Sequence, residues 1–163
     1  MRTNGEKRGP LDCSGKHVAI VVARFYDDLA EQLLDGAHRA LHDCRIGAGD
    51  IFVYDVPGCY ELPLACRNLI EADRFDAIVA LGVVIRGETP HFDYVAGECA
   101  RGIMDVQLAT GVPIGFGVLT TENREQAQER ADPARGDKGY EAAIAALRVL
   151  ELTADVPRAG FRR

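Results

Sequence analysis

Four apolar, β-branched runs, each followed by a segment with helical periodicity, constrain the fold of this 163-residue chain most strongly. The runs do not alternate apolar and polar residues, which is typical of strands buried on both faces of a parallel sheet. They occupy residues 17–23, 51–56, 77–85 and 112–118. Strands of this kind, separated by helices, predict a three-layer α/β sandwich with a four-stranded, parallel, doubly wound sheet.

The segments between the runs carry apolar residues at three- and four-residue spacing, which predicts helices. We expect these over residues 28–43, 61–73, 91–109, 123–131 and 137–152. Asp28 and Glu31 have the spacing of a capping box at the start of the first helix. We predict one α/β domain over residues 16–153, with flexible ends at residues 1–15 and 154–163.

The composition excludes several classes of protein. A formal net charge of −6 argues against a general nucleic-acid binder. The five cysteines form no CxxC pair, so they indicate neither a disulfide framework nor a zinc site and favour a reducing cytoplasm. No apolar run reaches the roughly 18 residues that span a bilayer, and the first 16 residues do not have the pattern of a secretory signal. We therefore expect a cytoplasmic location and no membrane partner.

Ligands of such sheets bind outside the carboxyl ends of the strands, so the residues after the four runs are candidate site residues. Aromatic, acidic, hydroxyl and imidazole side chains gather there. They are Phe25 and Tyr26 after the first run, Cys59, Tyr60 and Glu61 after the second, Glu88, Thr89 and His91 after the third, and Phe116, Thr120 and Thr121 at the fourth. Their convergence on one edge favours a binding site over separate structural roles.

The third junction, residues 87–95, is the most informative of these. A strand-to-helix turn leaves backbone N–H groups without helical partners, and such groups bind anions. His91 lies beside them, and histidine exchanges protons near neutral pH. The plainer interpretation is a histidine that caps or packs on the helix start.

The other candidates also have plainer explanations. Phe25 and Tyr60 would cover helix ends, or as a pair would sandwich a flat heterocycle. Glu61 suits a helix N-terminus or would accept hydrogen bonds from ligand hydroxyls. Arg130 and Lys138 would be surface charges, or would serve a neighbouring subunit's anion.

Several familiar chemistries lack their motifs. The chain has no GxxxxGK[ST], no GxGxxG after a strand and no GxSxG. The four histidines do not form a metal ligand set. Asp27 and Asp28 resemble the acidic pair of a receiver domain, but the third run ends without an aspartate to phosphorylate. Acid–base chemistry without metal is the remaining interpretation.

Five stretches, taken in order and with their spacing, resemble one known family. They are Ala23-Arg24-Phe25, Pro57 to Pro63 (PGCYELP), Gly82 to Val95 (GVVIRGETPHFDYV), Gly117 to Thr121 (GVLTT) with Glu125-Gln126-Ala127, and Asp137-Lys138-Gly139. Together they resemble the 6,7-dimethyl-8-ribityllumazine synthase family. The resemblance covers about residues 17–150, and the block from Gly87 to His91 is its most specific part.

The resemblance implies a flavodoxin-like fold and a transferase of riboflavin biosynthesis. Its reaction condenses 5-amino-6-(D-ribitylamino)uracil with 3,4-dihydroxy-2-butanone 4-phosphate to 6,7-dimethyl-8-ribityllumazine, without metal or cofactor. The family assembles as homopentamers or as icosahedral shells of pentamers, with riboflavin synthase as a possible partner. The implied catalytic residues are His91 and Arg130.

The resemblance also implies roles for the substrate-binding residues. Phe25 would stack on the pyrimidine, and Cys59, Tyr60 and Glu61 would line the ribityl chain. Backbone groups of Val83, Val84 and Ile85 would hold the pyrimidine edge, and those of Glu88 and Thr89 the phosphate. Phe116, Arg130 and Lys138 would come from the adjacent subunit.

Some residues depart from the common family pattern. Tyr26 stands where many members have Asn, Cys59 and Tyr60 replace a commoner Ala-Phe pair, and Glu88 occupies a place often held by a small residue. Two other functions stay open: a flavin- or lumazine-binding module without catalysis, and a structural shell protein with vestigial pockets.

Overall fold

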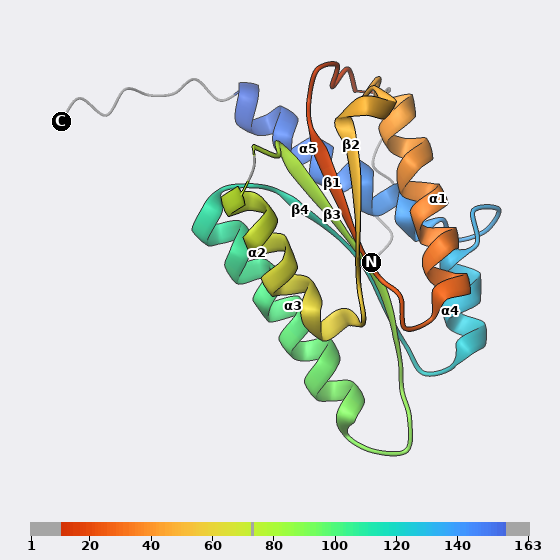
Figure 1. The fold of residues 1–163 in the computed structure, drawn as a ribbon. Coiled ribbons are helices and arrows are strands. Elements are labelled where there is room, and N and C mark those ends of the chain that lie inside the picture. The colour runs from red at the N-terminus through yellow and green to blue at the C-terminus, as the bar shows by residue number, and fades with distance from the viewer. Residues whose placement is uncertain (1–10, 73, 156–163) are drawn as a thin grey trace.

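The four predicted strands form one sheet in the computed structural model, which describes residues 11–72 and 74–155 (Figure 1). The strands are β1 (Val18–Ala23), β2 (Ile51–Val56), β3 (Ala77–Ile85) and β4 (Ile114–Thr121). Their order is β2-β1-β3-β4, and each neighbouring pair is parallel. The predicted α/β class and the flavodoxin-like parallel sheet are therefore confirmed.

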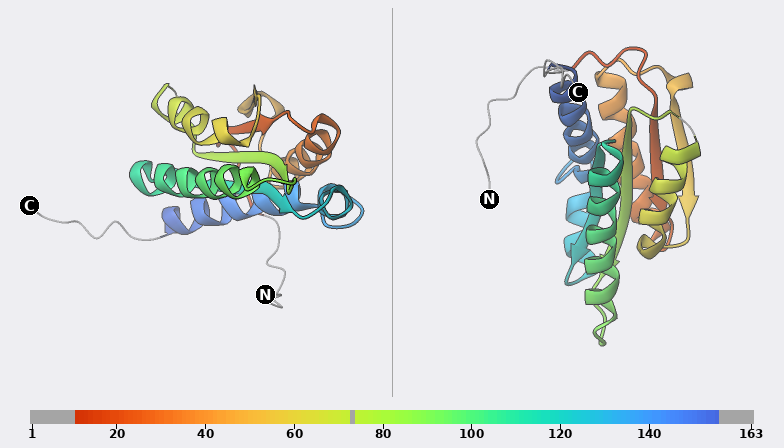
Figure 2. Two further views of the ribbon diagram at one scale, coloured as in Figure 1. Left: turned by 90° about the horizontal axis from the view of Figure 1, so that it is seen from below. Right: turned by 90° about the vertical axis from the view of Figure 1, so that its left-hand side faces the viewer.

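Helices cover both faces of the sheet. They are α1 (Asp27–Asp43), α2 (Leu62–Ala72), α3 (His91–Thr110), α4 (Arg124–Ala131) and α5 (Lys138–Asp155), with 3₁₀ turns η1 (Ala48–Asp50) and η2 (Cys59–Glu61). In Figure 2, α2 and α3 lie on one side of the sheet, and α1, α4 and α5 on the other. Alternate residues of β1 therefore belong to different cores, one packed against each helical layer.

The start of the first helix differs from the prediction. α1 begins at Asp27, and no side chain caps its N-terminus. Asp28 forms an ion pair with Arg124 of α4, and Glu31 forms one with Arg24. The capping box is therefore wrong, because Asp28 already lies inside the helix and both carboxylates form ion pairs with arginines.

Two strands also differ from their predicted form. β4 begins two residues later than predicted and continues through Thr121, which is paired with Ile85. β2 lies at the sheet edge, where its four middle residues are exposed in the single chain. Its apolar character therefore does not reflect burial on both faces within one chain.

The ends of the chain are only partly described. Leu11 and Cys13 are buried, and the Cys13 N–H donates to the Cys44 carbonyl at 2.8 Å. Residues 1–10 of the predicted arm and 156–163 of the predicted tail lie outside the described residues, as does residue 73. Within the described ranges, none of the helices has the length and apolar character needed to cross a membrane.

The contact between α1 and α5 requires glycine. A Cβ atom on Gly139 would overlap the carbonyl group of Leu33 in α1. We expect Gly139→Ala to lower the free energy of unfolding by about 3 kcal/mol, because two packed helices would have to move apart. Urea unfolding measures this, with Gly49→Ala as the control, since a Cβ there meets no atom within 4 Å. Equal unfolding midpoints for the two variants would contradict the prediction.

Candidate active site

The strand order places a crevice between β1 and β3. The chain runs outward from β1 to β2 and then crosses back to β3, so the loops after β1 and β3 diverge. These loops lie at the lower end of the sheet in Figure 1. A cavity of about 520 Å³ opens there. Its lining comprises Phe25, Tyr26, Pro57, Gly58, Cys59, Tyr60, Glu61, Val83, Val84, Ile85, His91, Tyr94 and Val95.

The mouth of this cavity is aromatic and its floor is apolar. The side chains of Phe25, Tyr60 and Tyr94 are 73%, 61% and 69% exposed. The Phe25 ring meets the edge of the Tyr26 ring, with 5.0 Å between centroids. Cys59, Val83 and Val84 are buried beneath them. Exposed rings over an apolar floor suit a flat heterocycle, which would bury both surfaces.

Cys59 contributes to the floor as a neutral thiol. Its Sγ lies 3.7 Å from the Val83 carbonyl oxygen, which the thiol approaches as a weak donor. Burial raises the pKa of Cys59 to about 12. A thiol in this state is a poor nucleophile at neutral pH. Cys59 therefore shapes the cavity without taking part in covalent chemistry.

His91 is the first residue of α3, directly after the turn that follows β3. Its backbone N–H is 3.4 Å from Thr89 Oγ1. Within the described ranges, the N–H groups of Gly87, Glu88 and Thr89 make no hydrogen bond. These groups are available to an anion beside His91.

Arg86 fixes this turn from the outer side. Its guanidinium contacts Asp93 at 3.2 Å and Glu122 at 2.8 Å, and it lies 4.3 Å from the centre of the Phe92 ring. The first turn of α3 and the end of β4 are thereby joined across the turn that precedes His91. Because two carboxylates already neutralise Arg86, its charge is not free for a substrate.

A second cavity, of about 420 Å³, lies between β4 and the helices α4 and α5. Phe116, Arg130, Lys138 and Glu141 are among its lining residues. Lys138 Nζ is 2.5 Å from Glu141. Arg130 donates to the Gln126 carbonyl at 3.0 Å and has no carboxylate partner in the part of the chain that the structure describes. Of the two cations that line this cavity, Lys138 is therefore paired with Glu141, and Arg130 is available to bind an anionic ligand.

The predicted site residues thus fall into three groups. Eight line the first cavity: Phe25, Cys59, Tyr60, Glu61, Val83, Val84, Ile85 and His91. Phe116, Arg130 and Lys138 line the second, which shares no lining residue with the first. Glu88 and Thr89 are exposed in the turn before α3 and line neither cavity. The Glu88 carboxylate therefore does not occupy the first cavity.

Some lining residues were missed by the sequence reasoning. Tyr94 and Val95 lie three and four residues after His91, so one helical face carries all three into the cavity. Their helical spacing from His91 could have predicted that Tyr94 and Val95 line the cavity. Glu141 stands three residues after Lys138, and the same spacing was its only signal. Tyr26 was expected at this edge of the sheet without an assigned role, and it lines the first cavity.

The fold and the crevice define a flavodoxin-like α/β protein with a cavity of about 520 Å³ beside the turn that precedes α3. Comparison with known proteins gives the family. The model of the family described as 6,7-dimethyl-8-ribityllumazine synthase matches residues 15–154. This chain belongs to that family.

A curated relative from Syntrophus aciditrophicus (strain SB) agrees with the family match. It is named 6,7-dimethyl-8-ribityllumazine synthase and is 49% identical over 144 residues. The aligned segment covers 88% of this chain and 94% of the relative. The prediction of this family from the sequence is confirmed, and with it the prediction of a transferase of riboflavin biosynthesis.

The buried thiols predict a loss of stability at high pH. Burial raises the pKa of Cys59, Cys66 and Cys99 to about 12, from an ordinary value of 9.0. Their neutral forms stabilise the fold fully below pH 9, and this contribution is lost as pH rises from 9 towards 12. We expect the unfolding midpoint of Cys66→Ala to fall less steeply between pH 8 and 11 than that of the wild type. Denaturant unfolding at each pH measures both slopes, and parallel slopes would contradict the prediction.

Proposed function

We propose that this chain condenses 5-amino-6-(D-ribitylamino)uracil with 3,4-dihydroxy-2-butanone 4-phosphate to form 6,7-dimethyl-8-ribityllumazine, phosphate and water. Membership of the family supports the reaction. One observation carries the assignment of residues: an aromatic cavity with a neutral floor opens beside His91, next to unpaired backbone N–H groups. A heterocycle and a phosphate would lie side by side in this arrangement.

The pyrimidine substrate, the ribitylaminouracil, would occupy the aromatic cavity. Phe25 would stack on its ring, and backbone groups of the end of β3 (Val83 to Ile85) would bind its polar edge. The ribityl chain would run along Cys59, Tyr60 and Glu61, where the Glu61 carboxylate would accept hydrogen bonds from hydroxyls. The apolar floor supports this placement, because it would exclude water from the ring.

The phosphate substrate, the dihydroxybutanone phosphate, would bind at the turn before α3. Backbone N–H groups of Glu88 and Thr89 would hold its phosphate, and Arg130 would pair with the same group as a planar fork. His91 would move protons during imine formation, phosphate elimination and ring closure, which each require proton transfer. Binding both substrates in register would convert a bimolecular reaction into an effectively unimolecular one.

The complete site would form between two copies of the chain. Phe116, Arg130 and Lys138 line a cavity separate from that of His91 within one chain. A head-to-tail arrangement would bring the second cavity of one subunit to the first cavity of the next, and such an arrangement forms a ring where the rotation between subunits closes. We infer a homopentamer, as the resemblance implies. A cytoplasmic location and a riboflavin synthase partner also stay predictions.

Lumazine formation tests the proposed reaction directly. The purified chain is mixed with both substrates, and absorbance and phosphate release are compared with a mixture lacking protein. Acceleration with one phosphate released per lumazine is the expected result. Binding of lumazine without acceleration would instead indicate a binding module, and neither acceleration nor binding would indicate a shell protein.

His91→Ala is expected to slow turnover without abolishing it. Loss of the proton-transfer group lowers kcat by roughly 10²- to 10⁴-fold, and some turnover persists because both substrates still bind in register. Steady-state kinetics with both substrates measure this, and His42→Ala, a change of an exposed histidine on α1, is the control. Unchanged turnover in His91→Ala would remove His91 from the mechanism.

Mixed assemblies test whether the site is shared between subunits. His91→Ala and Arg130→Ala subunits, when co-assembled, would give about a quarter of interfaces with both native residues. We expect activity above the mean of the two parent variants. Arg130→Ala mixed with the double variant His91→Ala/Arg130→Ala is the control, since no interface then carries both residues. Activity equal to the mean of the two parents in the first mixture would place both residues of the site within one chain.

A further inference from the structure

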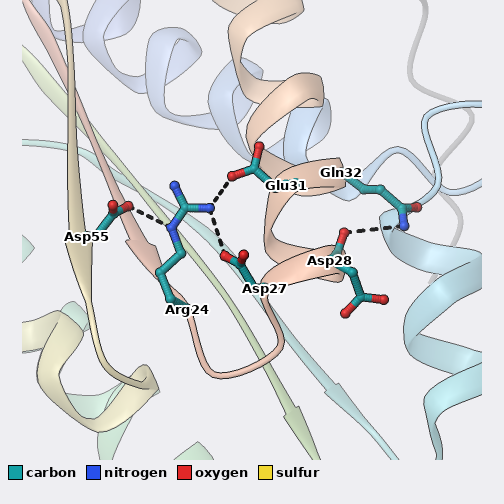
Figure 3. Close-up of polar contacts among 6 residues, drawn as sticks. All are labelled: Arg24, Asp27, Asp28, Glu31, Gln32 and Asp55. Atoms are coloured by element: carbon teal, nitrogen blue, oxygen red, sulfur yellow. Dashed lines mark hydrogen bonds and ion pairs between the residues drawn. The ribbon is translucent and has the colours of Figure 1, made fainter.

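Arg24, the residue directly after β1, makes an ion-pair network at the edge of the first cavity (Figure 3). Its Nε is 2.7 Å from Asp55 of β2. One terminal nitrogen contacts both Asp27, at 3.2 Å, and Glu31 of α1. A single guanidinium therefore joins the end of β2 to the first turns of α1.

The network holds more negative than positive charge. The Arg24 side chain is 24% exposed, whereas its three carboxylate partners are more than half exposed. Partial burial lowers the pKa of Arg24, but hydrogen bonds to Glu31 and Asp55 outweigh this, and the pKa is raised overall. Without the guanidinium, three carboxylates would face one another and repel.

The same residue joins two segments that line the cavity. The Arg24 backbone N–H donates to the Val56 carbonyl at 2.9 Å, directly before the Pro57-Gly58 turn. Phe25 follows Arg24, and its ring is 73% exposed, so its own packing fixes its position only weakly. The Tyr26 ring supports it at one edge. The orientation of Phe25 therefore depends on how firmly the backbone at Arg24 is held.

We propose that Arg24 is a positioning residue for the pyrimidine substrate: it holds the turns after β1 and β2 together, so that Phe25 stands over the cavity at stacking distance. This inference rests on the proposed function. Arg24 touches no reacting atom in it. The guanidinium would act through the geometry of Phe25 and of the Pro57-Gly58 turn.

The expected effect is on substrate binding rather than on global stability. The three carboxylate partners are more than half exposed, so water screens their ion pairs with the partly buried Arg24, and we expect only a small effect on folding. The Phe25 ring would stack on the pyrimidine equally in the bound and the transition state, so its displacement would weaken uniform binding, which raises KM and leaves kcat nearly unchanged. Loss of Arg24 should therefore change the constants for the pyrimidine substrate and leave those for the phosphate substrate nearly unchanged.

The test compares Arg24→Met with Arg24→Lys. For Arg24→Met we expect the pyrimidine substrate to show a KM roughly 10-fold higher, with kcat within about threefold of the wild type. For the phosphate substrate, KM should stay within about twofold of the wild-type value. Arg24→Lys should recover part of the loss, because an ammonium still neutralises one carboxylate but lacks the fork.

Two further variants sharpen the comparison. Asp55→Asn removes the ion pair between Arg24 and β2 but keeps Arg24 itself. We therefore expect the KM for the pyrimidine substrate to rise less than in Arg24→Met. Arg67→Met is the matched control, since Arg67 makes a 2.8 Å ion pair with Glu71 on the exposed face of α2. It should leave all three kinetic constants unchanged. An equal rise of the pyrimidine KM in Arg67→Met would overturn the proposal, because loss of any surface cation would then suffice.

Binding of the product lumazine, measured by fluorescence titration, separates this inference from the proposed function. If the wild type forms no lumazine, the proposed function fails, and weaker product binding by Arg24→Met would still support the positioning role. If the wild type is active and Arg24→Met keeps both the pyrimidine KM and the product affinity, the positioning role alone fails. The positioning role would also be overturned if Arg24→Met lowered kcat and thermal stability and raised both KM values together. That is the behaviour of a residue with only a structural role.

Discussion

Burial of the sheet between two helical layers is the constraint on which the rest of the structure depends. Parallel strands covered on both faces leave polar side chains little room except beyond their carboxyl ends. β1 and most of β3 are fully buried, so the chemistry collects in the turns after them. The same constraint explains the neutral floor of the first cavity, because Cys59, Val83 and Val84 are buried members of the hydrophobic core.

Charge is distributed unevenly around the site, and the distribution has a functional consequence. Arg24 and Arg86 lie close to the first cavity, yet carboxylates neutralise both of them. Arg130, in the second cavity, contacts only a backbone carbonyl among the described residues. An anionic substrate would therefore be attracted towards Arg130 and not towards the aromatic cavity. An aromatic cavity with a neutral floor and a cavity with an available cation would attract two different substrates, and long-range electrostatics would orient them as they approach.

Local pattern was enough to predict the strands, the helices and the parallel sheet, because apolar runs and helical spacing are read within a few residues. The predicted capping box failed partly for a non-local reason: Asp28 pairs with Arg124, 96 residues along the chain, whose position depends on the completed fold. Glu31 pairs with Arg24, seven residues before it. The exposure of β2 could not be predicted either, because an apolar run does not show which strand lies at the edge of the sheet. Most candidate site residues were found because strand ends converge by topology. Glu141 was not, because its place in the second cavity depends on its pairing with Lys138.

Different devices hold the two halves of the proposed site. His91 is fixed by its place in the first turn of a 20-residue helix, and Arg86 ties that turn to the end of β4. Phe25 belongs to no helix or strand, so its placement depends on the ion pairs of Arg24 and on the edge of Tyr26. His91 lies on a rigid helix and Phe25 on a turn held by ion pairs, so we expect substitutions near them to have different effects. Removal of the brace would displace the ring while the helix that carries the histidine stays intact, so substrate binding and chemistry are separable in this fold.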